Sequence, residues 1–201
     1  MPSPIDFYFD FSSPYGYLAS ERIDDIAARH GRTVNWHPML LGVVFKQTGM
    51  QPLTQIPIKG DYAARDFART ARMLKIPFAM PTTFPIPSQA PARIVLWLED
   101  TKGADAAKAY ARAAYRKFFV DGVDISIPAT AASIAAELGH DREQAAAAIE
   151  DPKYKAALKS VVETAIARGV FGSPFILVDG EPFWGTDRLP MVEEWLKSGG
   201  W

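Results

Sequence analysis

Strand-like segments occur near both ends of this chain and almost nowhere between them. The alternating, aromatic-rich run Ile5–Phe11 predicts one strand, and Thr33–Leu40 predicts a second. The next strand signals are Phe175–Val178 and Pro182–Trp184, which flank a hairpin turn at Asp179–Glu181. Because a strand must pair its backbone groups, these distant segments have to meet in one sheet. The region between them is therefore an insertion into the sheet domain and not a second domain joined by a linker.

The inserted region has the pattern of a group of helices. Alanine-rich amphipathic periodicity predicts helices at Asp61–Leu74, Ala92–Lys102, Ala104–Val120, Ala129–Leu138, Arg142–Ile149 and Lys153–Arg168. Asp141 and Asp151 are expected N-caps, the second followed by Pro152 at the first helical position. Further helices are expected at Pro14–His30 and Asp187–Lys197, a long ordered loop around a short helix at Gly42–Gly60, and an irregular segment at Ile76–Pro91.

This order predicts an α/β chain with a thioredoxin-like fold and a large all-helical insertion. The thioredoxin-like domain would be discontinuous, made of residues 1–42 and 168–201, and the helical insertion domain would span residues 43–167. We find no internal repeats.

Composition excludes several classes of protein. The chain has 201 residues, 48% of them hydrophobic, and a net charge of −1, which suits one globular domain with an insertion. Acidic and basic residues are mixed, so no basic face predicts nucleic-acid binding. No apolar run has the length of a membrane span, and the N-terminus does not resemble a signal peptide, so we expect a cytoplasmic protein.

The chain contains no cysteine. This count excludes disulfides, thiolate metal ligands and any redox cycle that uses the protein's own thiols. The three histidines, His30, His37 and His140, are scattered and do not pair with carboxylates at ligand spacing, so no metal site is predicted.

The segment Asp6–Ala19, "DFYFDFSSPYGYLA", joins the first strand to a helix. Redox proteins often carry Cys-x-x-Cys where a strand runs into a helix in this way. The matching tetrapeptide here is Ser13–Gly16, which we call the elbow. Ser13 would be the N-cap and Pro14 the first helical residue, which leaves the N–H groups of Tyr15 and Gly16 free to bind an anion. A thiolate brought by a ligand could then accept a hydrogen bond from the Ser13 hydroxyl. The alternative interpretation is an ordinary Ser-Pro helix start.

Two later segments could complete such a site. "GVFGSP", Gly169–Pro174, precedes a strand, where a thioredoxin fold places a cis proline facing the elbow. The backbone of Ser173 could then pair with an extended ligand, whereas the alternative is an ordinary loop proline. In "FWGTDRL", Thr186 and Asp187 are either an N-cap pair or a group whose carboxylate holds an ammonium ion.

These segments, in this order, resemble the 2-hydroxychromene-2-carboxylate isomerases and the related kappa-class glutathione transferases, in the DsbA-like branch of thioredoxin folds. Further matching segments are "GVVFKQTG" (residues 42–49), "KGDYAARD" (59–66), "IPFAMPTTFP" (76–85) and Arg93. The resemblance covers essentially the whole chain.

The resemblance implies an enzyme that uses glutathione as cofactor and forms a homodimer. Ser13 matches the catalytic serine that contacts the glutathione sulfur. The implied glutathione contacts are Ser13, Pro14, Tyr15, Lys59, Ser173, Pro174, Trp184, Gly185, Thr186 and Asp187. The implied contacts with a small aromatic carboxylate substrate are Lys46, Tyr62 and Phe84. The sequence departs from the family at Met50, where an asparagine is usual, and at Phe84, where the isomerases can carry a tyrosine.

The function predicted from this resemblance is glutathione-dependent isomerisation of a hydroxychromene carboxylate to its trans-benzylidenepyruvate in aromatic catabolism. The glutathione thiolate would add to the conjugated system, the adduct would rotate, and the thiolate would leave. One alternative is a kappa-class glutathione transferase or peroxidase, which would consume glutathione. A second is a non-catalytic binding module with a degenerate elbow, an interpretation that Met50 favours.

Overall fold

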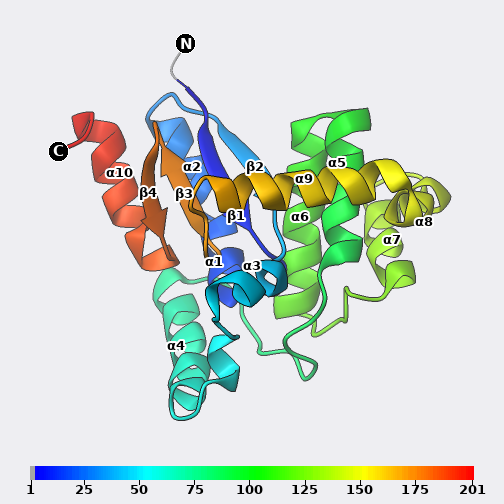
Figure 1. The fold of residues 1–201 in the computed structure, drawn as a ribbon, viewed down its shortest axis with the longest axis horizontal. Coiled ribbons are helices and arrows are strands. Elements are labelled where there is room, and N and C mark those ends of the chain that lie inside the picture. The colour runs from blue at the N-terminus through cyan, green and yellow to red at the C-terminus, as the bar shows by residue number, and fades with distance from the viewer. Residues whose placement is uncertain (1–2) are drawn as a thin grey trace.

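A four-stranded mixed sheet forms the centre of the computed structural model, which describes residues 3–201 (Figure 1). The strands are β1 (Ile5–Phe9), β2 (Val34–Pro38), β3 (Phe175–Val178) and β4 (Glu181–Trp184), in the order β2-β1-β3-β4. β1 is parallel to β2, with Ile5 opposite Val34, and β3 is antiparallel to both β1 and β4. Segments at the two ends of the chain therefore do share one sheet, as the sequence predicted.

The helices follow in chain order around this sheet. They are α1 (Pro14–Ser20), α2 (Ile23–Arg29), α3 (Leu41–Thr48), α4 (Lys59–Leu74), α5 (Gln89–Lys102), α6 (Ala104–Phe119), α7 (Pro128–Glu137), α8 (Arg142–Glu150), α9 (Pro152–Ala167) and α10 (Leu189–Ser198), with short 3₁₀ helices at Leu53–Gln55 and Thr186–Arg188. In Figure 1, α5 to α8 lie together to the right of the sheet, and α9 runs back from them toward the strands. α4 projects below the sheet. None of the helices among residues 3–201 is long and apolar enough to cross a membrane.

Strand directions bring four distant segments to one edge of the sheet. β1 and β2 run in parallel, so their C-terminal ends share this edge. β3 is antiparallel to β1 and therefore starts there, and β4, antiparallel to β3, ends there, with Phe175 opposite Trp184. The residues after β1, after β2, before β3 and after β4 consequently meet, although they are far apart in the sequence.

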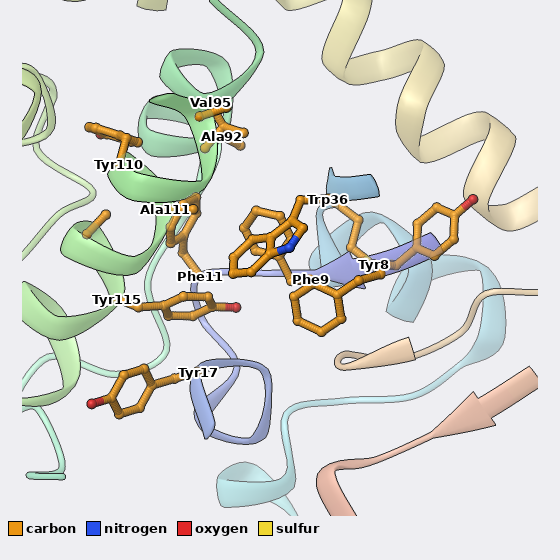
Figure 2. Packing of buried hydrophobic residues seen from close by; sticks show 14 of the residues in the cluster. Tyr8, Phe9, Phe11, Tyr17, Trp36, Ala92, Val95, Tyr110, Ala111 and Tyr115 are labelled. Atoms are coloured by element: carbon orange, nitrogen blue, oxygen red, sulfur yellow. The ribbon is translucent and has the colours of Figure 1, made fainter. Parts of the chain in front are cut away.

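The hydrophobic core joins the sheet to the helical insertion. Figure 2 shows aromatic side chains of β1 and β2 facing α6, with Phe9 and Trp36 in edge contact at 5.4 Å between ring centroids. Tyr115 of α6 lies 5.0 Å from the ring of Phe11, and all four side chains are buried. Burying each such ring contributes roughly 1.5–3 kcal/mol, so this shared layer fixes the insertion against the strands.

Most predicted elements are confirmed, but Pro14–His30 is two helices and not one. The break lies at Glu21 and Arg22, where the Arg22 N–H bonds three residues back to the Ala19 carbonyl at 3.0 Å. The Ser20 hydroxyl donates to the Tyr17 carbonyl at 2.7 Å, a local side-chain bond of the kind that competes with helix continuation.

Other differences are smaller. The segment expected to be irregular up to Pro91 becomes helical at Gln89, because Pro91 lies in the first turn of α5, where an N–H has no helical partner. The short helix expected within residues 42–60 corresponds to α3, which begins at Leu41. Asp141 and Asp151 are N-caps as predicted, accepting from the N–H groups of Gln144 and Lys153. The domain boundaries at residues 42 and 168 stay a prediction.

Candidate active site

A cavity of about 1200 Å³ lies at the edge of the sheet where the four segments meet. Its walls come from the elbow after β1, residues 40–56, α4, residues 84–89, and the segments before β3 and after β4. The lining includes Ser13, Pro14, Tyr15, Lys46, Tyr62, Phe84, Ser173, Trp184, Gly185, Thr186 and Asp187. The structure therefore brings together eleven side chains or backbone positions that the sequence and the resemblance singled out.

Lys59 and Pro174 are not among the residues that line this cavity. Lys59 is the first residue of α4 and is exposed. Pro174 follows the lining residue Ser173, and its peptide bond with Ser173 is cis, as expected. The binding roles of both residues, like those of the lining residues, stay predictions.

At the elbow, Ser13 is buried and uses its hydroxyl twice. The Ser13 Oγ accepts a hydrogen bond from the Gly16 N–H at 3.0 Å, which is the N-cap bond of α1. The same hydroxyl donates to the Ser173 carbonyl at 2.7 Å. The expectation that the Gly16 N–H is free was therefore wrong, because the N-cap side chain takes it. The Tyr15 N–H donates to none of residues 3–201, and it is the first-turn donor left for a ligand.

The loop before β3 is fixed to the end of β1 by a second bond. The Asp10 N–H donates to the Ser173 Oγ at 3.0 Å, and both residues are buried. The Tyr115 hydroxyl of α6 donates to the Asp10 carbonyl at 2.8 Å. The main chain just before Ser13 is thus held from the β3 side and from the helical insertion together.

The Asp10 side chain is a further anchor that sequence reasoning missed. Its carboxylate accepts from the Ser12 N–H at 2.8 Å, the Leu41 N–H at 2.6 Å and the Ser88 hydroxyl at 2.8 Å. Full burial raises the pKa of this carboxyl, while the three hydrogen bonds act in the opposite direction. The only signal in the sequence was an acidic residue between two phenylalanines just after the strand β1. Asp10 ties the elbow to the start of α3 and to the segment that precedes α5.

After β4, Thr186 is buried and its hydroxyl donates to the Tyr15 carbonyl at 2.6 Å. It therefore does not cap a helix, and the 3₁₀ helix Thr186–Arg188 has no side-chain cap at all. The N-cap interpretation of Thr186 and Asp187 was wrong. Asp187 is 70% exposed and pairs with Arg188 at 2.7 Å, which leaves its carboxylate open to solvent and to a ligand.

On the other side of the elbow, Tyr15 contacts α4. Its hydroxyl donates to Asp66, and its ring meets Phe67 edge-on at 4.9 Å between centroids. Asp66 also accepts from Arg69. Burial and the bond to Asp66 raise the pKa of Tyr15. Burial would raise the pKa of Asp66 as well, but the hydrogen bonds from Tyr15 and Arg69 outweigh it and lower that pKa.

Residues 3–201 contain no group of three His, Cys, Asp or Glu side chains placed to hold a metal ion. The elbow instead offers one hydroxyl and one free N–H group, beside the backbone of Ser173. The arrangement suits recognition of a small anion or thiolate held by an extended, peptide-like ligand.

Comparison with known proteins gives a consistent grouping. The family model of the DSBA-like thioredoxin domain matches residues 4–197. A 2-hydroxychromene-2-carboxylate isomerase from Sphingobium xenophagum is 29% identical over 199 residues, covering 98% of this chain and 99% of that protein. A glutathione S-transferase kappa 1 from Homo sapiens is 26% identical, covering 98% and 94%. A solved structure of a 2-hydroxychromene-2-carboxylate isomerase matches with a TM-score of 0.87 and 27% identity, covering 96% and 94%.

Proposed function

The chain belongs to the family of DSBA-like thioredoxin domains, and we propose that within it the protein is a glutathione-dependent isomerase of the 2-hydroxychromene-2-carboxylate type. The observation that carries this proposal is the buried Ser13 hydroxyl, which faces the Ser173 carbonyl at the cavity wall in a chain with no cysteine. If the elbow carries out thiol chemistry, its sulfur would come from a ligand, because the chain has no cysteine.

The relatives support the choice of chemistry. The isomerase relative and the matching isomerase structure both cover nearly the whole chain, which supports the isomerase type. The kappa relative carries glutathione in its name, which supports glutathione as the thiol.

Glutathione would be bound along the edge of the sheet. Its cysteinyl unit would pair with the Ser173 backbone, as an added strand does. The Ser13 hydroxyl now bonds to the Ser173 carbonyl, and on binding it would rotate to donate to the sulfur instead. The same rotation frees the Ser173 carbonyl to accept the cysteinyl N–H. The γ-glutamyl end would lie toward Trp184, with its ammonium group near the exposed Asp187 carboxylate.

The reaction would proceed by reversible thiolate addition. The substrate's ring-opened form carries a double bond conjugated to a ketone, and an intact π bond cannot rotate. Bound glutathione would supply a thiolate that adds reversibly to this conjugated system, so that the double bond becomes a single bond that can rotate and glutathione is returned unchanged. Hydrogen bonds from Ser13 and the Tyr15 N–H would stabilise the thiolate before addition and after its release.

A kappa-class transferase is the second candidate, because the human kappa relative also covers nearly all of this chain. The two functions differ in one measurable quantity, the glutathione concentration. A transferase consumes one glutathione per turnover, whereas an isomerase leaves the glutathione concentration constant while substrate disappears.

The proposal is tested by titrating glutathione into wild-type protein and Ser13→Ala near neutral pH while recording the ultraviolet absorbance of the thiolate. We expect a thiolate signal in the wild type that is largely lost in Ser13→Ala. Ser133→Ala removes an exposed α7 hydroxyl that also bonds to a backbone carbonyl, and it should behave as the wild type. Well-folded protein that binds no glutathione would refute the enzyme proposal and leave the non-catalytic binding module. Retention of the thiolate signal in Ser13→Ala would refute the role of Ser13.

We also propose that the protein works in the cytoplasm as a homodimer. Cytoplasmic glutathione is reduced and could supply the thiol, and the dimer rests on the family resemblance. Size-exclusion chromatography with light scattering tests the dimer, and a monomer mass would refute it.

A further inference from the structure

Beyond the elbow, much of the lining of the cavity is apolar. Residues 40–56, α4 and the loop before α5 contribute Phe45, Leu53, Ile56, Phe67, Phe84 and Ile86 to this apolar wall. Such a wall suits a flat aromatic molecule, since aromatic and aliphatic side chains bury its faces. It offers no hydrogen bonds, so any polar group of that molecule needs a separate partner.

Three cationic side chains line the cavity: Lys46, Arg69 and Arg188. Arg188 is already paired with Asp187 at 2.7 Å, on the side formed by the segment after β4. Lys46 lies in the last turn of α3 and forms no ion pair with any of residues 3–201. Fixing such a free lysine on a ligand costs side-chain entropy, up to about 2 kcal/mol.

Arg69 differs from Lys46 because it is held in place while it retains free donors, and it differs from Arg188 because two partners hold it, the Asp66 carboxylate and the Tyr62 hydroxyl. Its Nη2 donates to the Asp66 carboxylate and to the Tyr62 hydroxyl, the latter at 2.9 Å. The guanidinium also lies 5.3 Å from the Tyr62 ring centroid. Within the described chain its Nε and Nη1 donate to no acceptor, and the side chain is 55% exposed. A preorganised guanidinium with unused N–H groups is well suited to bind a carboxylate.

The position of Arg69 also connects it to the elbow. Asp66, which holds Arg69, accepts the Tyr15 hydroxyl with its other oxygen. Tyr15 is two residues after Ser13 and provides the free N–H at the elbow. The Asp66 carboxylate therefore bridges Arg69 and Tyr15, and the apolar ring of Phe67 lies against Tyr15.

We propose that Arg69 is a specificity-determining residue that binds the carboxylate of the aromatic substrate, so that the cavity selects aromatic acids over neutral aromatics. This inference rests on the proposed function, since it assigns a residue to the substrate of that same reaction. Because Lys46 is unpaired and exposed, it is the competing candidate for this role.

The test measures binding without turnover. trans-Cinnamate and trans-cinnamamide have the same shape and differ in charge, and both can be titrated into the glutathione-treated protein by isothermal calorimetry. We expect wild-type protein to bind cinnamate about tenfold more tightly than cinnamamide, as one charge-assisted hydrogen bond contributes. In Arg69→Gln this preference should disappear while cinnamamide binding stays unchanged. Arg69→Lys should retain part of the preference.

Arg65→Gln is the matched control, since Arg65 is an exposed arginine of the same helix that does not line the cavity. It should retain the full preference for cinnamate. A preference that survives in Arg69→Gln and vanishes in Lys46→Gln would overturn the assignment. So would a wild-type protein that binds the two probes equally, or neither of them.

The two proposals fail in distinguishable ways. Turnover of a hydroxychromene carboxylate by wild-type protein, combined with no preference for cinnamate, refutes Arg69 as the carboxylate anchor and leaves the isomerase function standing. A cinnamate preference that depends on Arg69, in a protein that shows no thiolate signal with glutathione, supports Arg69 and refutes the isomerase.

Discussion

Replacing Gly16 by alanine tests how tightly the elbow is built. A Cβ at this position would lie 2.7 Å from the Tyr115 hydroxyl and 2.8 Å from the Ser173 hydroxyl. These two oxygens hold the main chain of Asp10, one through its carbonyl and the other through its N–H. Both are buried and fixed by partners, so they cannot move away without breaking those bonds. The methyl group therefore has to disturb the bonds that place the elbow.

The magnitude follows from three contributions. Alanine is the better helix former by about 1 kcal/mol. Overpacking a buried site costs roughly 1–3 kcal/mol, and weakening two buried hydrogen bonds costs about 1 kcal/mol each. The net loss in the free energy of unfolding is about 2–4 kcal/mol. For a chain of this size each 1 kcal/mol lowers the unfolding temperature by roughly 2–4 °C, so Gly16→Ala should unfold about 4–16 °C below wild type.

The assay is thermal unfolding followed by circular dichroism, with Gly42→Ala as the matched control. Gly42 is also helical, in the first turn of α3, but a Cβ there would meet no atom within 4 Å. That variant should be as stable as wild type, or up to about 1 kcal/mol more stable. Unfolding of Gly16→Ala at or above the wild-type temperature would refute the steric argument. An equal loss in Gly42→Ala would show that the cause is not the crowding at Gly16.

Three further variants test other parts of the structure. Burial raises the pKa of Asp6, but hydrogen bonds from His37 and from Arg168 outweigh it and hold that pKa below its ordinary value. The resulting stability is present above about pH 4 and is lost as the pH falls through the lowered pKa, so Arg168→Gln should cost about 0.5–1 kcal/mol in urea unfolding at pH 7 and less at the acid end, where only its contacts with Tyr8 are lost; a loss independent of pH would contradict this linkage. Asp141→Ala removes the N-cap of α8 and should cost about 1 kcal/mol, whereas Asp141→Asn should cost much less; equal losses would argue against a capping role. Tyr115→Phe removes the hydroxyl donor of the buried Asp10 carbonyl, which keeps its bond from the Ser13 N–H, so it should cost about 1 kcal/mol in the same assay, and a neutral result would show that this bond is dispensable.

Elements with local causes could be predicted from the sequence. The alternation of Ile5–Phe11 identified β1, although the strand ends at Phe9. The Ser13-Pro14 pair identified the start of α1, and Asp141 and Asp151 identified two helix starts. In each case the responsible side chains lie within a few residues of the element that they specify, so the pattern is visible along the chain.

The anchors of the candidate site could not be predicted, because their partners come from distant segments. Asp10 became visible as an anchor only when the fold placed Leu41 and Ser88 within 2.8 Å of its carboxylate. Thr186 was expected as part of a cap, but the end of β4 lies beside the elbow, and its hydroxyl reaches the Tyr15 carbonyl instead. A short polar side chain at a helix start predicts a cap on average, and a tertiary acceptor at hydrogen-bond distance overrides that preference.

The attachment of α4 links the two ends of the cavity. α4 contacts the rest of the protein through α1 and through Arg22, which follows α1. Asp66 accepts the Tyr15 hydroxyl, Phe67 contacts the Tyr15 ring, and the Leu74 carbonyl accepts from Arg22. The helix that carries the proposed carboxylate anchor is therefore mounted on the helix that carries the proposed thiolate site. Since Tyr15 makes two of these three contacts, a displacement of the elbow should be transmitted to α4 and to Arg69. The parts of the apolar wall that lie on residues 40–56 and 84–89 do not depend on Tyr15 in this way.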